Sequence, residues 1–200
     1  MGRAAESVPR RALDRAVVVT TDWPPIADDP YIFVTVGTDH HPFHRLMQWV
    51  DKWTATNGHI RLAVQSGTSI PPTAPHRPEL DYHDLLKAIE ESLGTVSHGG
   101  PATITEIRQS GRIPIVVPRR AKFGEHVDDH QLLFCQRIAA DGLIRLVDTE
   151  DQFEQAIHDL LENPELFRHT PDQNARIAQT LDTFRSLIAK IIPAGDPIQA

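Results

Sequence analysis

The chain has 200 residues, of which 40% are hydrophobic and 24% are charged, and its formal net charge is −7. This length and composition are typical of one globular domain with a sizeable core, whereas the acidic charge argues against a general nucleic-acid binder, which needs a basic face. Cys135 is the one cysteine, which excludes an internal disulfide framework and favours a reducing cytoplasm, and no apolar run reaches the ~18 residues of a membrane span.

The first 30 residues differ in composition from the rest of the chain. Residues 1–30 are rich in Arg, Ala, Pro and Asp, which predicts a flexible N-terminal extension, although AVVVT at 16–20 could form a short strand. We expect the ordered domain to begin near Tyr31. The run YIFVTV at 31–36 is continuously apolar and β-branched, which is typical of a strand buried on both faces of a parallel sheet.

Strands and helices then alternate along the chain. Pro42 fits the first position of a helix whose apolar stripe runs to Trp53, and the proline-rich segment 68–78 predicts a loop. Further strands are predicted at 59–67, 94–98, 113–118 and 143–147, and further helices at 82–93, 101–110, 128–140 and 150–161. This alternation predicts an α/β fold, a single Rossmann-like domain over 31–165 with a parallel sheet and helices on both faces.

A last amphipathic helix is predicted after this domain. Within the segment 166–200, apolar residues recur at spacings of three and four between 171 and 191. We expect this helix to pack on the parent domain or, alternatively, on a partner chain.

The segment SHGGPATITE at 97–106 predicts an anion site. Ligands of open α/β sheets lie beyond the carboxyl ends of the strands, and His98 stands at such an end. Gly99 and Gly100 remove side chains where a ligand approaches the backbone, and Pro101 fits the first helical position. The free N–H groups of the first turn would then face a diphosphate, and His98 would add a donor.

The next turn of the same helix offers a carboxylate. Thr103 and Glu106 are three residues apart and share a helical face, so Glu106 is well placed to accept two hydrogen bonds from a ribose diol. The alternative is that His98 and the two glycines form only a tight turn, because Gly-Gly is not the G-x-G-x-x-G fingerprint.

A long polar loop follows the strand predicted at 113–118. Arg119, Arg120 and Lys122 supply positive charge that suits an anionic substrate. Gln131 falls in the first turn of the following helix, where it could bind sugar hydroxyls.

Two clusters could also hold a metal ion. Asp39, His40, His41 and His44 lie close together, but Pro42 interrupts the His40–His44 spacing and the Glu of an H-E-x-x-H site is missing. A solvated surface loop, or a loop histidine that contacts a ligand, explains this cluster better than a metal site does. EHVDDH at 125–130 is the second cluster, and its composition alone makes a metal site plausible.

These residues stand in an order found in a known family. His98, Gly100, Thr103 and Glu106, the strand at 113–118 and then Asp129-His130-Gln131 resemble the donor-binding half of GT-B glycosyltransferases, in particular the C-terminal domain of glycosyltransferase family 28. The opening FVTVGTDHHPFHRLMQWVDKW at 33–53 is similar to single-domain members of this family, the catalytic subunits of two-component transferases. FGEHVDDHQ at 123–131 is similar to bacterial members that make exopolysaccharide or capsule.

The resemblance implies a nucleotide-sugar site. The implied donor-binding set is His98, Gly99, Gly100, Ala102, Thr103, Glu106, Asp129, His130 and Gln131. The diphosphate would lie at the residues between 98 and 103, the ribose at Glu106, and the sugar at the residues 129–131. Gly37, Thr38 and His41 would face the partner and the acceptor, and the uracil would lie near 65–67. Relatives often carry an Asn shortly after the Gln, whereas this chain has Leu133, Phe134 and Cys135 there.

The resemblance also implies a function. The chain would be an inverting, metal-independent transferase that needs no cofactor and moves a sugar from a UDP-sugar to a polyprenyl-linked acceptor. A second, membrane-anchored subunit would supply the catalytic base and recruit this cytoplasmic chain to the inner face of the membrane. The alternatives are a non-catalytic UDP-sugar sensor or scaffold and an epimerase-like enzyme.

Overall fold

Six parallel strands form one sheet in the order β3-β2-β1-β4-β5-β6 in the computed structural model, which describes residues 30–58 and 60–169. The strands are β1 Tyr31–Thr35, β2 Arg61–Gln65, β3 His76–Arg77, β4 Gly94–His98, β5 Ile115–Val117 and β6 Arg145–Leu146. This is the strand order of a doubly wound Rossmann fold, with the switch point between β1 and β4. The predicted α/β class and parallel sheet are confirmed.

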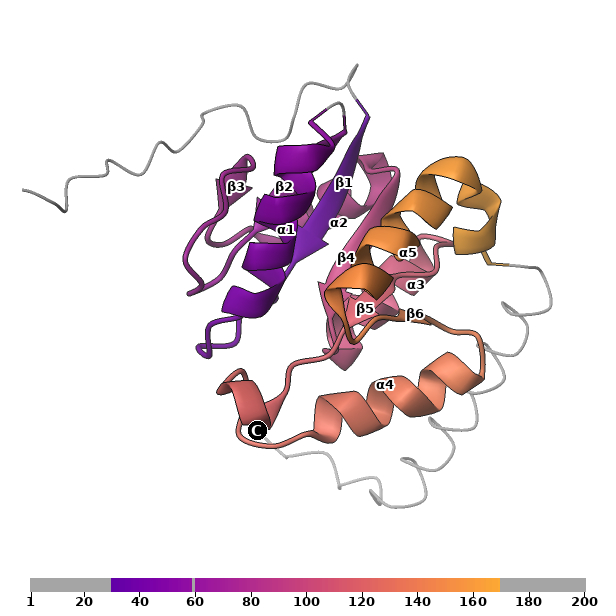
Figure 1. Cartoon of the computed structure of the whole chain (residues 1–200). Coiled ribbons are helices and arrows are strands. Elements are labelled where there is room, and N and C mark those ends of the chain that lie inside the picture. Colours follow the sequence, from indigo (N-terminus) through magenta and orange to yellow (C-terminus); the bar gives the residue numbers. More distant parts are fainter. Residues whose placement is uncertain (1–29, 59, 170–200) are drawn as a thin grey trace, which may run out of the picture.

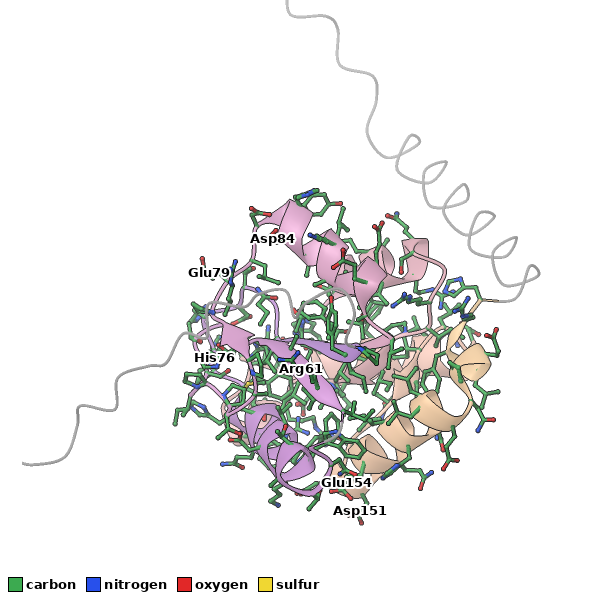
Figure 2. All side chains as sticks on the ribbon, turned by 90° about the horizontal axis from the view of Figure 1, so that it is seen from above. Arg61, His76, Glu79, Asp84, Asp151 and Glu154 are labelled. Carbon is green, nitrogen blue, oxygen red and sulfur yellow. The ribbon has the colours of Figure 1, made fainter. Side chains whose placement is uncertain are left out.

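Helices cover both faces of the sheet (Figure 1). They are α1 His44–Thr56, α2 Tyr82–Glu91, α3 Pro101–Gln109, α4 His130–Ala140 and α5 Glu150–Glu162, with 3₁₀ turns η1 Ala121–Phe123 and η2 Pro164–Phe167. Figure 2, seen from above, shows Arg61 of β2 in the strand layer, Asp84 of α2 on one side of it, and Asp151 and Glu154 of α5 on the other.

Alternate residues of β1 explain the two layers. Ile32 and Val34 belong to the core that packs under α1 and α5, whereas Tyr31 and Phe33 belong to the core under α2 and α3. Successive side chains of a strand point to opposite faces, so a strand in mid-sheet must be apolar on both. The continuous apolar run at the start of the domain is therefore the reason that β1 lies at the centre of the sheet.

The prediction of a loop across 68–78 was wrong at its end. His76 and Arg77 form β3, a two-residue edge strand beside β2, and the backbone N–H of Val64 donates to Pro75 O at 2.9 Å. A strand this short and polar has no apolar pattern that could identify it. β4 has the predicted bounds, whereas β1, β2, β5 and β6 are shorter than predicted by one to four residues.

Pro42 was predicted to open a helix, but it lies two residues before the start of α1. The helix begins at His44 with Phe43 at the N-cap, and the backbone N–H of Phe43 donates to Ser69 Oγ at 2.8 Å. The hydroxyl that satisfies the helix start therefore comes from the loop after β2 rather than from a neighbour in sequence. The predictions for residues 1–29, including the strand at 16–20, and the helix at 171–191 lie outside the described residues.

The chain stays part of the same core through η2. Phe167 is buried against α5, and a bridge pairs Arg112 with Arg168. Among the helices of residues 30–58 and 60–169, none combines the length and the apolar character that a bilayer span requires.

Candidate functional site

The loops after β1, β4 and β5 meet at the carboxyl edge of the sheet, and Arg119 joins the loops after β1 and β5. Its guanidinium is completely buried and donates to the backbone oxygens of Val36 at 2.9 Å, His41 at 2.6 Å and Glu125 at 3.1 Å. Its charge also lies 4.9 Å from the ring centre of Phe43. Arg119 was predicted to offer charge to an anionic substrate, but its Nη1 and Nη2 atoms donate within the protein and hold the loops after β1 and β5 together.

A second buried charge fixes the loop after β5. Glu125 accepts two hydrogen bonds from Arg45 of α1, from Nε and Nη2, both at 2.9 Å, and a third from the backbone N–H of Arg120 at 2.9 Å. Such a bidentate pair is rigid as well as strong. The sequence analysis placed Glu125 in a ligand-binding loop and missed Arg45, because the two residues are 80 positions apart.

His98 lies between two glycines. A Cβ added at Gly37 or at Gly100 would overlap its imidazole ring, and Gly37 also has a positive φ of 72°. Burial, with a smaller effect of the Arg119 charge, lowers the pKa of His98 to about 4. His98 is therefore neutral near pH 7 and can offer a neutral N–H donor, but no positive charge, to a ligand.

Gly99 makes room for the protein's own side chains. A Cβ there would lie 2.9 Å from Cys135 Sγ and 3.1 Å from Gln131 Oε1. Gln131 is buried, and its Oε1 accepts from the backbone N–H of Arg119 at 3.3 Å. The glycines are thus explained in part by internal packing, and the oxygen of Gln131, predicted to bind sugar, is already engaged within the protein. Cys135 is buried, and burial raises its pKa to about 12.

The first turn of α3 presents free backbone donors. Gly100 is the N-cap and Pro101 opens the helix, as predicted, and no side chain caps it. The N–H groups of Ala102 and Thr103 have no acceptor within the helix, and the positive end of the helix dipole lies behind them. This end of α3 is therefore an electropositive patch made of backbone.

A cavity of about 460 Å³ opens beside this turn. It lies between the start of α2 and α3 and is lined by Tyr82, Pro101, Ala102, Thr105, Glu106 and Gln109. Tyr82 is 63% exposed, and burial raises the pKa of Glu106. Gln65 and Ser66, near which the resemblance places the uracil, are buried and hydrogen-bonded to Thr35 and Arg77.

Tyr82 and Gln109 are the cavity residues that the sequence analysis missed. Tyr82 begins α2 and Gln109 lies on α3, so their proximity depends on how the two helices pack and no local sequence pattern indicates it. Of the predicted set, Ala102 and Glu106 line this cavity.

The other predicted residues lie on the loops after β1 and β5. Thr38 is exposed, and Asp39 Oδ1 lies 2.7 Å from both the backbone N and Nδ1 of His41. Asp129 Oδ1 accepts from the backbone N–H of Ala121 at 2.9 Å, so this carboxylate shapes the loop around η1.

Histidines connect these two loops. The ring of His126 lies between those of His41 and His130, with centroid distances of 5.6 and 4.5 Å. Asp128 Oδ1 accepts from the backbone N–H of His130 at 3.0 Å and contacts its Nδ1. Asp39, His40 and His41 form one set, and His126, Asp128 and His130 another, in which candidate metal-ligand atoms lie within 4.8 Å of one another.

Known proteins resemble this chain in sequence and in fold. The model of the glycosyltransferase family 28 C-terminal domain matches residues 31–189, whereas no curated protein matches. The glycotransferase of kitacinnamycin superposes with a TM-score of 0.56 at 18% identity, over 96% of this chain and 48% of that one. MurG of Acinetobacter baumannii gives 0.51 at 19%, over 70% and 43%.

CalG4, the calicheamicin glycosyltransferase, gives a TM-score of 0.53 at 12% identity, over 85% of this chain and 46% of that one. This chain therefore spans a little under half the length of each of these three proteins, and the likeness to them is one of fold. The family model covers most of the chain, including every site residue described above. The chain belongs to the glycosyltransferase family 28 C-terminal domain family.

Proposed function

We propose that this chain binds a UDP-sugar and takes part in transferring its sugar to an acceptor hydroxyl. The observation that carries the proposal is the cavity that joins the uncapped first turn of α3 to the half-buried carboxylate of Glu106. It offers a patch for a diphosphate beside a carboxylate acceptor for a ribose, in the order in which a nucleoside diphosphate carries these groups. Membership of the glycosyltransferase family supports the same assignment.

Each part of the donor has a place in this proposal. The diphosphate lies at the N–H groups of Ala102 and Thr103, with His98 as a neutral donor below it, and the ribose hydroxyls donate to Glu106. The nucleobase lies in the remaining cavity against the ring of Tyr82, because an exposed aromatic ring can stack on a base. The sugar extends towards His130.

The departing diphosphate gains negative charge as the glycosidic bond breaks. Backbone N–H groups and a helix dipole stabilise such a charge without a metal ion, and one such donor is worth roughly 2.7–4 kcal/mol. We therefore propose transfer without metal or other cofactor, and the resemblance to the family implies that the transfer inverts the anomeric configuration. Turnover that is unchanged by EDTA supports this, and turnover that Mg²⁺ or Zn²⁺ restores after EDTA contradicts it.

The acceptor side is proposed from the resemblance to single-domain members of the family. A membrane-anchored second subunit would hold a polyprenyl-linked saccharide and recruit this chain to the cytoplasmic face of the membrane, in exopolysaccharide or cell-surface glycan synthesis. Cross-linking the full chain in its own cells should capture one membrane protein. If transfer to polyprenyl-linked saccharide proceeds with this chain alone, the second subunit is not needed.

Calorimetry with UDP tests the donor site. Glu106→Ala should weaken UDP binding about 10–100-fold, since it removes an acceptor for two hydroxyls. Tyr82→Ala should weaken binding of UDP about 5–100-fold through lost stacking but leave binding of inorganic diphosphate unchanged, and Tyr82→Phe should bind UDP normally. Glu91→Ala, an exposed carboxylate on α2, is the matched control. UDP binding to the wild type that neither variant alters would place the nucleotide elsewhere.

A further inference from the structure

We infer that His41, oriented by Asp39, is the general base of the transfer reaction, so that this chain itself carries the group that takes the proton of the acceptor hydroxyl. The inference rests on the proposed function. It replaces the expectation, drawn from the resemblance, that the base lies on a second subunit.

The imidazole of His41 is held by one carboxylate oxygen. Asp39 Oδ1 lies 2.7 Å from the backbone N of His41 and 2.7 Å from its Nδ1, so the same turn that shapes the loop also fixes the ring. The other oxygen, Oδ2, lies 3.5 Å from Nε2 of His126. Asp39 is thus held from both sides, by its own loop and by the loop after β5.

The charge on Asp39 decides which nitrogen of His41 carries the proton. Burial alone would raise the pKa of Asp39, but the hydrogen bonds from the backbone and side chain of His41, with the nearby Arg119, lower it to about 2. An ionised carboxylate can only accept, so Nδ1 of His41 must be the donor. Nε2 then keeps its lone pair, which is the form that a base needs.

The loop of His41 is fixed against the donor site. Gly37 packs on the ring of His98, and Arg119 donates to the backbone oxygen of His41 while its own N–H donates to Gln131. The rings of His41, His126 and His130 form an arc that ends at the first turn of α4, where the sugar of the donor is proposed to lie. The side chain of His41 is 23% exposed, so an acceptor can reach it.

The second Asp-x-His pair of the site is less suited to this role. Asp128 and His130 have the same spacing and the same turn, but their side chains are 60% and 56% exposed, against 26% for Asp39 and 23% for His41. Water screens the more exposed pair, so its carboxylate stabilises an imidazolium less. Burial therefore favours His41 over His130 as the base.

The proposed step balances in atoms and charge. The O–H bond of the acceptor breaks and its proton moves to Nε2 of His41, while the acceptor oxygen forms a bond to the anomeric carbon. The bond from that carbon to the β-phosphate oxygen breaks, and its electron pair leaves with UDP. Asp39 stabilises the imidazolium until it returns the proton to solvent.

The test uses the full chain with UDP-glucose, UDP-galactose, UDP-glucuronic acid or UDP-N-acetylglucosamine, and water as the acceptor. If the base lies on this chain, the wild type should slowly hydrolyse the donor that it binds and release UDP. His41→Gln should release UDP about 10²–10⁴-fold more slowly with UDP affinity unchanged within twofold. Asp39→Asn should slow release as well, because an amide no longer fixes the tautomer.

Two further measurements separate catalysis from structure. Added imidazole should restore UDP release to His41→Gly, which a merely structural role would not allow. His40→Gln is the matched control, since His40 stacks on His41 with a centroid distance of 4.0 Å but has an 86% exposed side chain, and it should release UDP like the wild type.

Each other outcome is decisive. UDP release by His41→Gln at the wild-type rate overturns the inference and leaves the proposed function standing. A wild type that binds the donor without hydrolysing it also overturns the inference, because the base then lies elsewhere. Loss of UDP affinity in His41→Gln assigns the residue a binding role instead. A wild type that binds no UDP-sugar removes the proposed function, and the inference with it.

Discussion

Arg119 determines how the loops of the carboxyl edge are held. Its three carbonyl partners belong to two loops that are about 80 residues apart in sequence, and the charged group is out of contact with water. A guanidinium can reach three acceptors in different directions from one plane, whereas an ammonium is a compact point charge. The identity of this residue as arginine is therefore a structural requirement of the site.

We expect Arg119→Lys to lower the free energy of unfolding by roughly 3 kcal/mol, because buried carbonyls lose charge-assisted hydrogen bonds. Urea denaturation followed by circular dichroism measures the change. Arg120→Lys is the matched control: Arg120 pairs with Asp148, whose side chain is 44% exposed, so its change should stay within about 1 kcal/mol. Equal losses in the two variants would contradict this account.

Arg119 also shows where residue-level prediction ends. A pair of arginines after an apolar strand indicates positive charge at the ligand edge, but the pattern is the same whether the charge meets a ligand or backbone carbonyls. Gln131 and Gly99 are similar cases, because their contacts with Arg119 and Cys135 depend on how α4 packs. The placement of Glu106 on α3 could be predicted because it depends only on helical spacing from Gly100, whereas its role towards a ribose stays a prediction.

At the scale of elements, α1 depends on a distant residue. The hydroxyl of Ser69 is 26 positions from the N-cap residue whose N–H it accepts, and it is buried. Local sequence rules search for a capping side chain at the N-cap itself. They therefore placed the helix start at Pro42, two residues too early.

We expect Ser69→Ala to lower the free energy of unfolding by about 1 kcal/mol, the usual contribution of a helix cap. The variant leaves the N–H of Phe43 buried without its acceptor. Thermal unfolding measures the change, with Ser69→Thr as a partner that keeps the hydroxyl. An unchanged melting temperature in Ser69→Ala would show that another group can satisfy this N–H.

Long apolar strands and amphipathic helices could be predicted because they depend on local sequence patterns rather than on distant residues. β1 and α5 carry their own periodic patterns, and such patterns need no knowledge of distant contacts. β3 has two polar residues and is recruited by pairing with β2, so no local pattern indicates it.

At the scale of the whole molecule, the buried His98 and the half-buried Asp39 make stability depend on pH. The pKa of His98 is about 4 in the fold against 6.5 as its ordinary value, so between these pH values the unfolded chain binds a proton that the folded chain does not. Stability is then unaffected by His98 above pH 6.5 and falls as the pH drops towards 4. Asp39, lowered from 3.8 to about 2, extends the loss of stability below pH 3.8.

We expect the free energy of unfolding to fall between pH 6.5 and 4 by on the order of 3 kcal/mol from His98 alone, since one pH unit corresponds to about 1.4 kcal/mol per proton. Urea titrations at several pH values measure this dependence. His98→Gln should flatten it over that interval. A variant that keeps the full slope would assign the acid sensitivity to other groups.

The overall fold and the family could be predicted because they depend on the order of many elements and motifs, each of which tolerates local error. The interior of the site could not, because neutral His98 and buried Arg119 acquire their character from desolvation, which appears only when the loops come together.

Both outer strands of the described sheet, β3 and β6, are only two residues long. Each leaves little unpaired backbone on which a neighbouring molecule could extend the ladder. The folded domain should therefore resist edge-to-edge aggregation even at the high local concentrations that a crowded surface imposes.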